Sequence, residues 1–338
     1  MPLIDNPILL LGAQRSGTTW LGKIFDSHPD VLYRHEPDHG RAPPADVGEP
    51  GVRTAIQEWI DTRTQRAAAK RPFFRKSWQS AAAFWLRNGL TALLAAGARL
   101  PAIGRKIGRL AVPDFGVGKR LAVKSIDWCD GVGALARALP HSRTIVILRH
   151  PCGQVASVMR GNRQGRFALR EPGTDMPFDE IPTLRFAAER GVDDPAFQAL
   201  PEAAKHAWDW VRFNETGLRS LQGVPNARIV IYEELCAQPA AVVRDLLAFC
   251  GLEWTEQTGS FIEQSTGDAN STGYYAVFRD SIAAAERWRT GMTADDRDAV
   301  RAVVRRSALA QFWPDLTPPP GAGASSRTTA PPPTPRSP

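Results

Sequence analysis

The sequence predicts an α/β fold in which an open parallel sheet of about five strands is covered by helices on both faces, with one helical insertion. The composition is that of a globular protein, since 43% of the 338 residues are apolar and 23% are charged. Short β-type runs alternate with segments of helical periodicity, which is typical of a parallel sheet with crossover helices. A chain of this length can bury a large core.

Five short apolar runs are the expected strands. Each is almost continuously apolar, as strands buried on both faces are. The first run stops at Gly12, so it is too short for the apolar part of a signal peptide or for a spanning helix. The runs occupy residues 7–11, 31–33, 121–124, 144–148 and 228–232.

Two segments between these runs have the spacing of amphipathic helices, at residues 18–27 and 240–250. Each has one apolar face, which we expect to pack on the sheet. The apolar positions are Trp20, Leu21, Ile24 and Phe25 in the first helix and Val242, Val243, Leu246, Leu247 and Cys250 in the second.

The stretch between the second and third strands is longer than a crossover requires, so we expect residues 53–118 to form a helical insertion. Within it, residues 75–109 mix large apolar side chains with Arg and Lys. This pattern fits either a helical lid packed on the sheet or a basic amphipathic surface that contacts a membrane. One α/β domain is expected over residues 1–316, followed by a disordered tail rich in Pro, Gly, Ser and Thr at 317–338.

The formal net charge of +7 favours an anionic partner without choosing among small ligands, membranes and nucleic acids. The cysteines are scattered, without a C-x-x-C pair or a histidine at metal-ligand spacing. We therefore expect no disulfide framework, no metal site and a cytoplasmic location. The four cysteines are Cys129, Cys152, Cys236 and Cys250.

The first strand leads through a glycine-rich turn into a helix, in the segment LLLGAQRSGTTWL at residues 9–21. This order of elements points backbone N–H groups and the positive end of a helix dipole at one place, which is suited to an anion. The spacing of Gly12 and Gly17 equals that of the Walker A loop, but Thr18 occupies the position of its lysine. The positive charge lies at Arg15 instead, whose guanidinium can pair bidentately with phosphate or sulfate oxygens.

The segment GAQRSGTTWL resembles the loop that binds the 5′-phosphosulfate in sulfotransferases that use 3′-phosphoadenylyl sulfate (PAPS). A second family motif, an arginine at the end of a later strand with a serine eight residues on, is matched by Arg149 and Ser157. The resemblance covers most of residues 5–313. It implies a P-loop-like fold and transfer of a sulfuryl group from PAPS to a hydroxyl or amine, with no metal required.

The resemblance also implies where the donor is held. The loop residues would bind the 5′-phosphosulfate, and Arg149 and Ser157 the 3′-phosphate. Arg279 is a further candidate for the 3′-phosphate, or a surface ion-pair residue, because the following residues depart from the family pattern. Trp20 matches a position that stacks on adenine, or it belongs to the core. The expected donor contacts are Arg15, Ser16, Gly17, Thr18, Thr19, Trp20, Arg149, Ser157 and Arg279.

The general base of the cytosolic members is absent here. In those proteins a histidine follows two positions after a lysine at the end of the third strand, whereas Lys124 is followed by Ile126 in that place. Lys124 remains a candidate contact to the transferred group. The segment YRHEP at residues 33–37 resembles the Glu-Pro segment of bacterial and carbohydrate-type members, in which the glutamate is the base. We therefore expect Glu36 to be the base, with His35 as the alternative.

No motif specifies the acceptor, for which a sugar hydroxyl, a glycolipid and a small metabolite are the candidates, and none indicates an oligomeric state. We expect no nucleic acid partner. Two other functions share parts of this pattern. A P-loop kinase or nucleotidase has the same strand, loop and helix but needs Mg²⁺ and the loop lysine. A non-catalytic protein that binds anions or a membrane surface would use residues 75–109.

Overall fold

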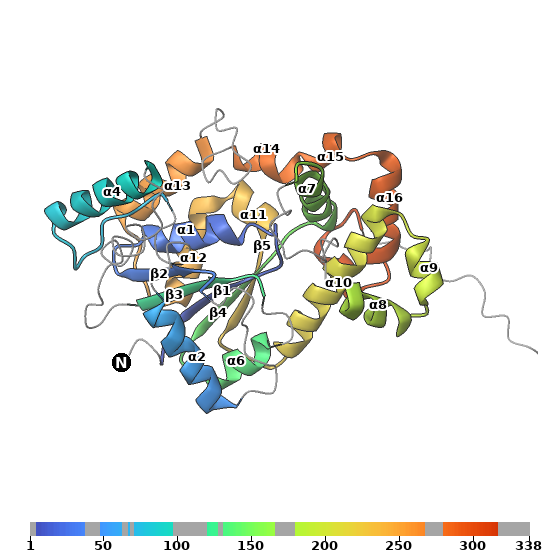
Figure 1. The fold of residues 1–338 in the computed structure, drawn as a ribbon, viewed down its shortest axis with the longest axis horizontal. Helices are drawn as coiled ribbons and strands as arrows, with labels where there is room; N and C mark the ends of the chain where they lie inside the picture. The colour runs from blue at the N-terminus through green and yellow to red at the C-terminus, as the bar shows by residue number, and fades with distance from the viewer. Residues whose placement is uncertain are drawn as a thin grey trace, which may run out of the picture.

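The centre of the molecule is a parallel sheet of five strands in the order β2-β3-β1-β4-β5, shown in Figure 1. The computed structural model describes residues 5–37, 48–62, 67, 71–96, 120–127, 131–165, 180–267 and 280–316. The five apolar runs of the sequence are these strands, so the predicted α/β class is confirmed. The strands are β1 (Ile8–Leu11), β2 (Val31–His35), β3 (Arg120–Ser125), β4 (Arg143–Leu148) and β5 (Ala227–Ile231).

Helices cover both faces of the sheet, because successive side chains of a strand point to opposite faces. Ile8 and Leu10 of β1 pack with α1 and α11–α13 on one side, and Leu9 and Leu11 pack with α2, α6, α7, α10 and α16 on the other. The helices are α1 (Thr18–Ser27), α2 (Glu49–Asp61), α4 (Ala81–Ala96), α6 (Val132–Ala138), α7 (Pro151–Arg163), α8 (Glu180–Ala188), α9 (Asp194–Gln198), α10 (Glu202–Ser220), α11 (Tyr232–Ala237), α12 (Pro239–Phe249), α13 (Glu256–Gly267), α14 (Ser281–Glu286), α15 (Trp288–Gly291), α16 (Ala294–Val304) and the 3₁₀ helix η1 (Ala308–Phe312).

The register of the sheet brings the ends of the strands to one edge. Lys124 of β3 pairs with His35 of β2 on one side and with Leu10 of β1 on the other, and Leu11 pairs with Val146 of β4. The segments that follow these strands therefore emerge side by side at the carboxyl edge. Ligands of open α/β sheets bind at this edge.

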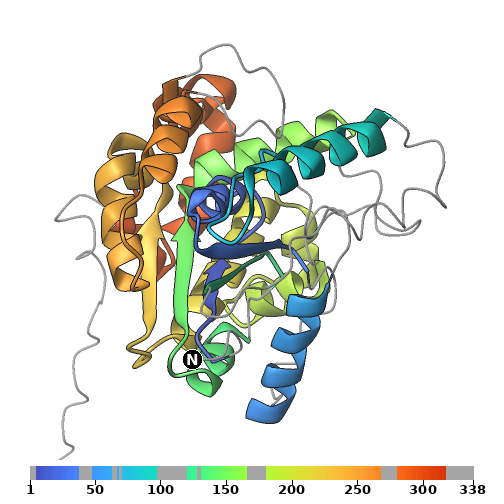
Figure 2. The ribbon, with the colours of Figure 1, turned by 90° about the vertical axis from the view of Figure 1, so that its left-hand side faces the viewer.

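The insertion contributes two described helices. α2 packs into the core through Val52 and Ile56, while Figures 1 and 2 place α4 on the side of the sheet that α1 covers. Trp85 and Leu86 of α4 are exposed by 70% and 65%. Arg87 is buried, with its guanidinium 4.5 Å from the centroid of the Phe73 ring. The described part of α4 thus presents apolar side chains outward and its arginine inward, unlike a basic amphipathic surface.

Several predictions fall on residues that the structure does not describe. They concern the remainder of residues 75–109, Cys129, Arg279 and the tail at 317–338, and the domain limits also stay predictions. Among the described helices, none combines the length and apolarity needed to cross a membrane.

Candidate active site

The loop at residues 12–17 joins β1 to α1 at the carboxyl edge. Its turn is closed by the N–H of Ser16, which donates to the carbonyl of Ala13 at 3.1 Å. Arg15 and Gly17 have positive φ angles of 70° and 103°. Gly17 is the N-cap of α1, and no side chain caps this helix end. The first N–H groups of α1 have no partner within the helix, so they are suited to binding an anion.

Steric contacts explain why two positions of the loop are occupied by glycine. A Cβ atom on Gly12 would lie 2.7 Å from the carbonyl oxygen of Ile147 and 2.8 Å from Oγ of Ser16. A Cβ atom on Gly17 would overlap the ring of Tyr232, at a backbone angle that side chains already disfavour. The loop can approach β4 and α11 this closely only with glycine at both positions.

Three of the predicted donor contacts meet beside this loop. Nε of Arg15 donates to Oγ of Ser157 at 3.1 Å. Nη1 of Arg149 donates to the carbonyl of Arg15 at 3.0 Å, and Nη2 donates to the carbonyl of Ala284 at 3.1 Å. Arg149 is only 8% exposed. The structure therefore connects the loop, the end of β4 and α7 through two guanidinium groups, and Ser157 contacts Arg15 rather than Arg149.

Two polar atoms at this place are buried and lack a hydrogen-bond partner among the described residues. They are Oγ of Ser16 and Nε of Arg149. Unpaired buried polar groups are costly and rare in folded proteins. Their position at an uncapped helix end and on a buried guanidinium indicates a site prepared for an anionic ligand. Thr18 is buried in the first turn of α1 and Thr19 is half-buried beside it.

His150 fixes the start of α7, the helix that carries Ser157. Its Nδ1 accepts from the N–H of Cys152 at 3.2 Å, which makes it the N-cap. Its ring stacks on Trp288 with centroids 4.4 Å apart. Burial lowers the pKa of His150 to about 4, so the imidazole is neutral at pH 7 and can accept this bond. The cap holds Arg149 and Ser157 in a fixed relation.

Glu36 and Lys124 form a second buried cluster at the same edge. The N–H of Glu36 donates to the carbonyl of Lys124 at 2.7 Å, and Nζ of Lys124 donates to Oε1 of Glu36. Glu36 has a φ of 45°, an uncommon angle for a residue with a side chain. Such strain costs about 1–3 kcal/mol and clusters at functional sites. Nε2 of His35 lies 3.7 Å from the same Oε1.

Tyr232 is a site residue that the sequence analysis missed. Its ring lies 4.7 Å below the guanidinium of Arg149 and contacts Gly17 of the loop. It also packs edge-on against Trp20, with ring centroids 6.5 Å apart. Its place at the end of the fifth apolar run, at the carboxyl edge of the sheet, is the signal that could have indicated this role.

Trp20 lies within the core layer between α1 and α13. Its side chain is buried, and its indole N–H donates to Oγ of Ser265 at 3.0 Å. Of the two alternatives for this residue, the structure displays the core packing. Adenine stacking by Trp20 stays a prediction, as does the role of Arg279.

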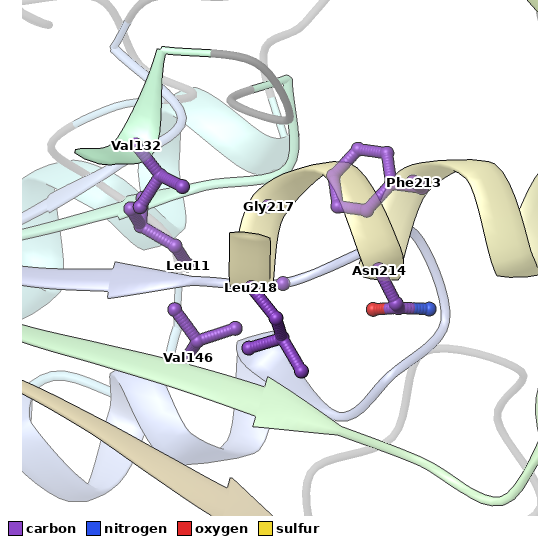
Figure 3. A pocket seen from close by; sticks show the side chains of 8 residues that line it. Leu11, Val132, Val146, Phe213, Asn214, Gly217 and Leu218 are labelled. Atoms are coloured by element: carbon purple, nitrogen blue, oxygen red, sulfur yellow. The ribbon is translucent and has the colours of Figure 1, made fainter. Parts of the chain in front are cut away.

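A small pocket reaches the loop at Gly12 from the face opposite α1, as Figure 3 shows. It has room for little more than a water molecule, so it is not a nucleotide site. Its walls are mostly apolar, and Asn214 is the polar side chain in them. The lining residues are Leu11, Gly12, Val132, Val146, Phe213, Asn214, Gly217 and Leu218.

Potential metal ligands are not clustered in the part of the chain that the structure describes. No group of three or more His, Cys, Asp or Glu side chains there could hold a metal ion. Cys152, Cys236 and Cys250 are buried free thiols.

Comparison with known proteins identifies the family. The model described as "Sulfotransferase family" matches residues 7–256. No curated protein matches the chain. Similar solved structures include the sulfotransferase domain of the curacin biosynthetic pathway, with 14% identity over 89% of this chain and 97% of that chain and a TM-score of 0.44. The mouse sulfotransferase SULT7A1 with PAP has 13% identity over 91% and 87% and a TM-score of 0.43. Because the family model matches well over half of this chain, the chain belongs to the sulfotransferase family.

Proposed function

We propose that this sulfotransferase uses PAPS as its donor, bound along the carboxyl edge from the loop at residues 12–17 to Arg149. The observation that carries the proposal is the meeting of Arg15, Ser157 and Arg149 beside an uncapped helix N-terminus. The unpaired Ser16 hydroxyl and Arg149 Nε support the fit of an anionic donor. A hydrogen bond to a charged group contributes about 1.5–3 kcal/mol, so a few of them hold a nucleotide firmly.

In the proposed arrangement, Arg15 and the loop amides bind the 5′-phosphosulfate, while Arg149 binds the 3′-phosphate. The donor supplies an activated sulfuryl group. Cationic side chains and backbone amides fixed in place stabilise the charge on such a group without having to reorganise during the reaction. Side chains from the loop, the end of β4 and α7 thus support the roles that the family resemblance implies.

We assign the proton transfer to Glu36. Adjacent strands lie about 4.8 Å apart, so the end of β2 is within roughly 10 Å of the end of β1, where the loop begins. An acceptor hydroxyl between them would pass its proton to the Glu36 carboxylate as its oxygen attacks the sulfur. The bond between the sulfur and the bridging oxygen of the 5′-phosphosulfate breaks in the same step, and adenosine 3′,5′-bisphosphate leaves with that oxygen. A positioned base of this kind contributes about 10²- to 10⁴-fold to the rate. Lys124 holds Oε1 of this carboxylate, and it pairs in the sheet with Leu10, two residues before the loop begins at Gly12.

Turnover of ³⁵S-labelled PAPS on a panel of saccharides, phenols and lipids tests this function. We expect wild-type protein to label at least one acceptor and Glu36→Gln to bind adenosine 3′,5′-bisphosphate normally while losing turnover by about 10²-fold or more. The exposed Glu263→Gln is the matched control. An active Glu36→Gln protein would remove the base assignment. Magnesium-dependent ATP turnover without sulfuryl transfer would favour the kinase alternative.

The exposed apolar side of α4 favours an acceptor presented at a lipid surface. Trp85 and Leu86 are large apolar side chains that are exposed on this helix, and such side chains insert at a lipid interface. We expect a Trp85→Ser/Leu86→Ser protein to co-sediment less with phosphatidylglycerol vesicles than wild type. Ile181→Ser on α8, an equally exposed apolar position, is the control. Equal co-sedimentation of all three proteins would contradict the lipid contact.

A further inference from the structure

We propose that His35 positions the carboxylate of Glu36 and does not accept the proton itself, and that the Tyr33 hydroxyl fixes His35 for this task. The inference rests on the proposed function, in which Glu36 is the base. In this arrangement Glu36 and His35 are not alternative bases. Glu36 accepts the proton, His35 orients Glu36, and Tyr33 orients His35.

Tyr33 and His35 lie on one face of β2, because side chains two residues apart on a strand point the same way. The Tyr33 hydroxyl and Nδ1 of His35 are 2.9 Å apart, a hydrogen-bond distance. The other ring nitrogen, Nε2, lies 3.7 Å from Oε1 of Glu36. All three side chains are buried, by at least nine-tenths of their surface. The imidazole is therefore hydrogen-bonded through Nδ1, and its Nε2 faces the carboxylate at a distance longer than a hydrogen bond.

The charges around His35 select one tautomer. A carboxylate oxygen faces Nε2, so a proton on Nε2 is attracted and a lone pair there is repelled. In the neutral imidazole with its proton on Nε2, Nδ1 accepts a hydrogen bond and the Tyr33 hydroxyl is the donor. Burial, followed by the carboxylates of Asp26 and Glu36, raises the pKa of Tyr33 well above 10, which keeps this hydroxyl protonated. A hydrogen bond to one ring nitrogen commonly fixes the tautomer of the other.

The space for the Tyr33 hydroxyl is built into α1. A Cβ atom on Gly22 would overlap this hydroxyl, so the helix carries a glycine here although glycine is a poor helix former. The adjacent Lys23 ammonium lies 5.3 Å from the centroid of the Tyr33 ring. The helix that begins at the anion loop thus also supports the side chain that holds His35. The charged groups around Tyr33 and His35 are Lys23 and Asp26 of α1, Glu36 directly after β2, and Lys124 of β3.

Substitution by glutamine separates positioning from proton acceptance. The amide nitrogen of Gln can replace the Nε2–H donor of His35, but an amide cannot act as a base at neutral pH. We expect His35→Gln to keep kcat within about 5-fold of wild type and His35→Ala to lose about 10-fold or more, because His35→Ala removes the polar group that faces the carboxylate and His35→Gln retains one. KM and the affinity for adenosine 3′,5′-bisphosphate should change little. The exposed His141→Gln is the matched control.

These rates are measured with the acceptor that wild type labels best and, independently of any acceptor, as hydrolysis of PAPS to sulfate. A His35→Gln protein as inactive as Glu36→Gln would overturn the inference and make His35 the base. Failure of wild type to bind the bisphosphate nucleotide would instead overturn the proposed function. The two failures are therefore distinguishable.

The tautomer can be measured directly in the wild-type chain, which has 6 histidines, by ¹⁵N–¹H correlation spectroscopy of the rings. We expect His35 in the Nε2–H form, and a mixture of forms in Tyr33→Phe together with a kcat lowered about 3- to 10-fold at unchanged nucleotide affinity. A proton on Nδ1 in wild type would refute the role of Tyr33. So would an unchanged tautomer and kcat in Tyr33→Phe.

Discussion

Arg149 offers the sharpest test of how the nucleotide is held. Its Nη1 and Nη2 each donate to a backbone carbonyl, and its buried Nε has no partner among the described residues. In the proposed arrangement, Arg149 would contact the 3′-phosphate through Nε and through its charge. Loss of one hydrogen bond to a charged group costs about 1.5–3 kcal/mol. We thus expect Arg149→Ala to weaken the affinity for adenosine 3′,5′-bisphosphate about 10- to 150-fold.

The assay is calorimetric titration with two ligands, adenosine 3′,5′-bisphosphate and adenosine 5′-phosphate. Arg149→Ala should lose affinity for the first and retain its affinity for the second, which lacks the 3′-phosphate, whereas Arg15→Ala should weaken both. Arg219→Ala removes the same charge from a side chain that is 62% exposed and should change neither affinity. Thermal unfolding of each variant reports whether the fold is kept. Equal losses for both ligands in Arg149→Ala, or no loss, would refute the reasoning.

Two more predictions concern the loop and the buried charges behind it. Gly17→Ala should weaken nucleotide binding and lower the free energy of unfolding by about 1–3 kcal/mol, because φ is positive and a Cβ atom meets Tyr232. Gly291→Ala, with open space around it, is the control. Equal unfolding midpoints of the two variants would contradict the steric argument. Burial opposes ionisation of Asp26, but its two lysine partners outweigh burial and lower its pKa from 3.8 to about 2. The resulting stabilisation, about 2 kcal/mol, is present above pH 4 and is lost as pH falls through 2. Between pH 5 and pH 2, the free energy of unfolding measured with denaturant should fall less in Asp26→Asn than in wild type. An equal fall in both proteins would exclude the effect.

The strands and the anion loop were predictable because their signals are local. A run of apolar residues in a buried strand and a glycine turn before a helix are both read from neighbouring positions. The strand that ends just before Arg149 was predictable in the same way. So was the position of the Arg149 and Ser157 motif, which comes after the loop in the chain. The carboxyl-edge location of Glu36 and Lys124 also followed, because parallel strands end together.

The sequence could not show contacts between segments that lie far apart along the chain. Asp26 is buried because Lys76, fifty residues further along the chain, donates to it at 3.0 Å. Tyr232 reads as a residue that begins a helix, yet it supports Arg149 and leaves room only for glycine at position 17. Arg87 is charged in a mostly apolar helix, and it points inward against the ring of Phe73 and is attracted by Asp26. Periodicity carries no information about such partners.

A crystal structure of the protein soaked with adenosine 3′,5′-bisphosphate tests the central claim most directly. The account predicts the 5′-phosphate against the backbone amides of residues 17–19 and the guanidinium of Arg15, and the 3′-phosphate against Arg149. Nucleotide density elsewhere on the molecule, or a bound nucleotide with its phosphates away from both arginines, would contradict it.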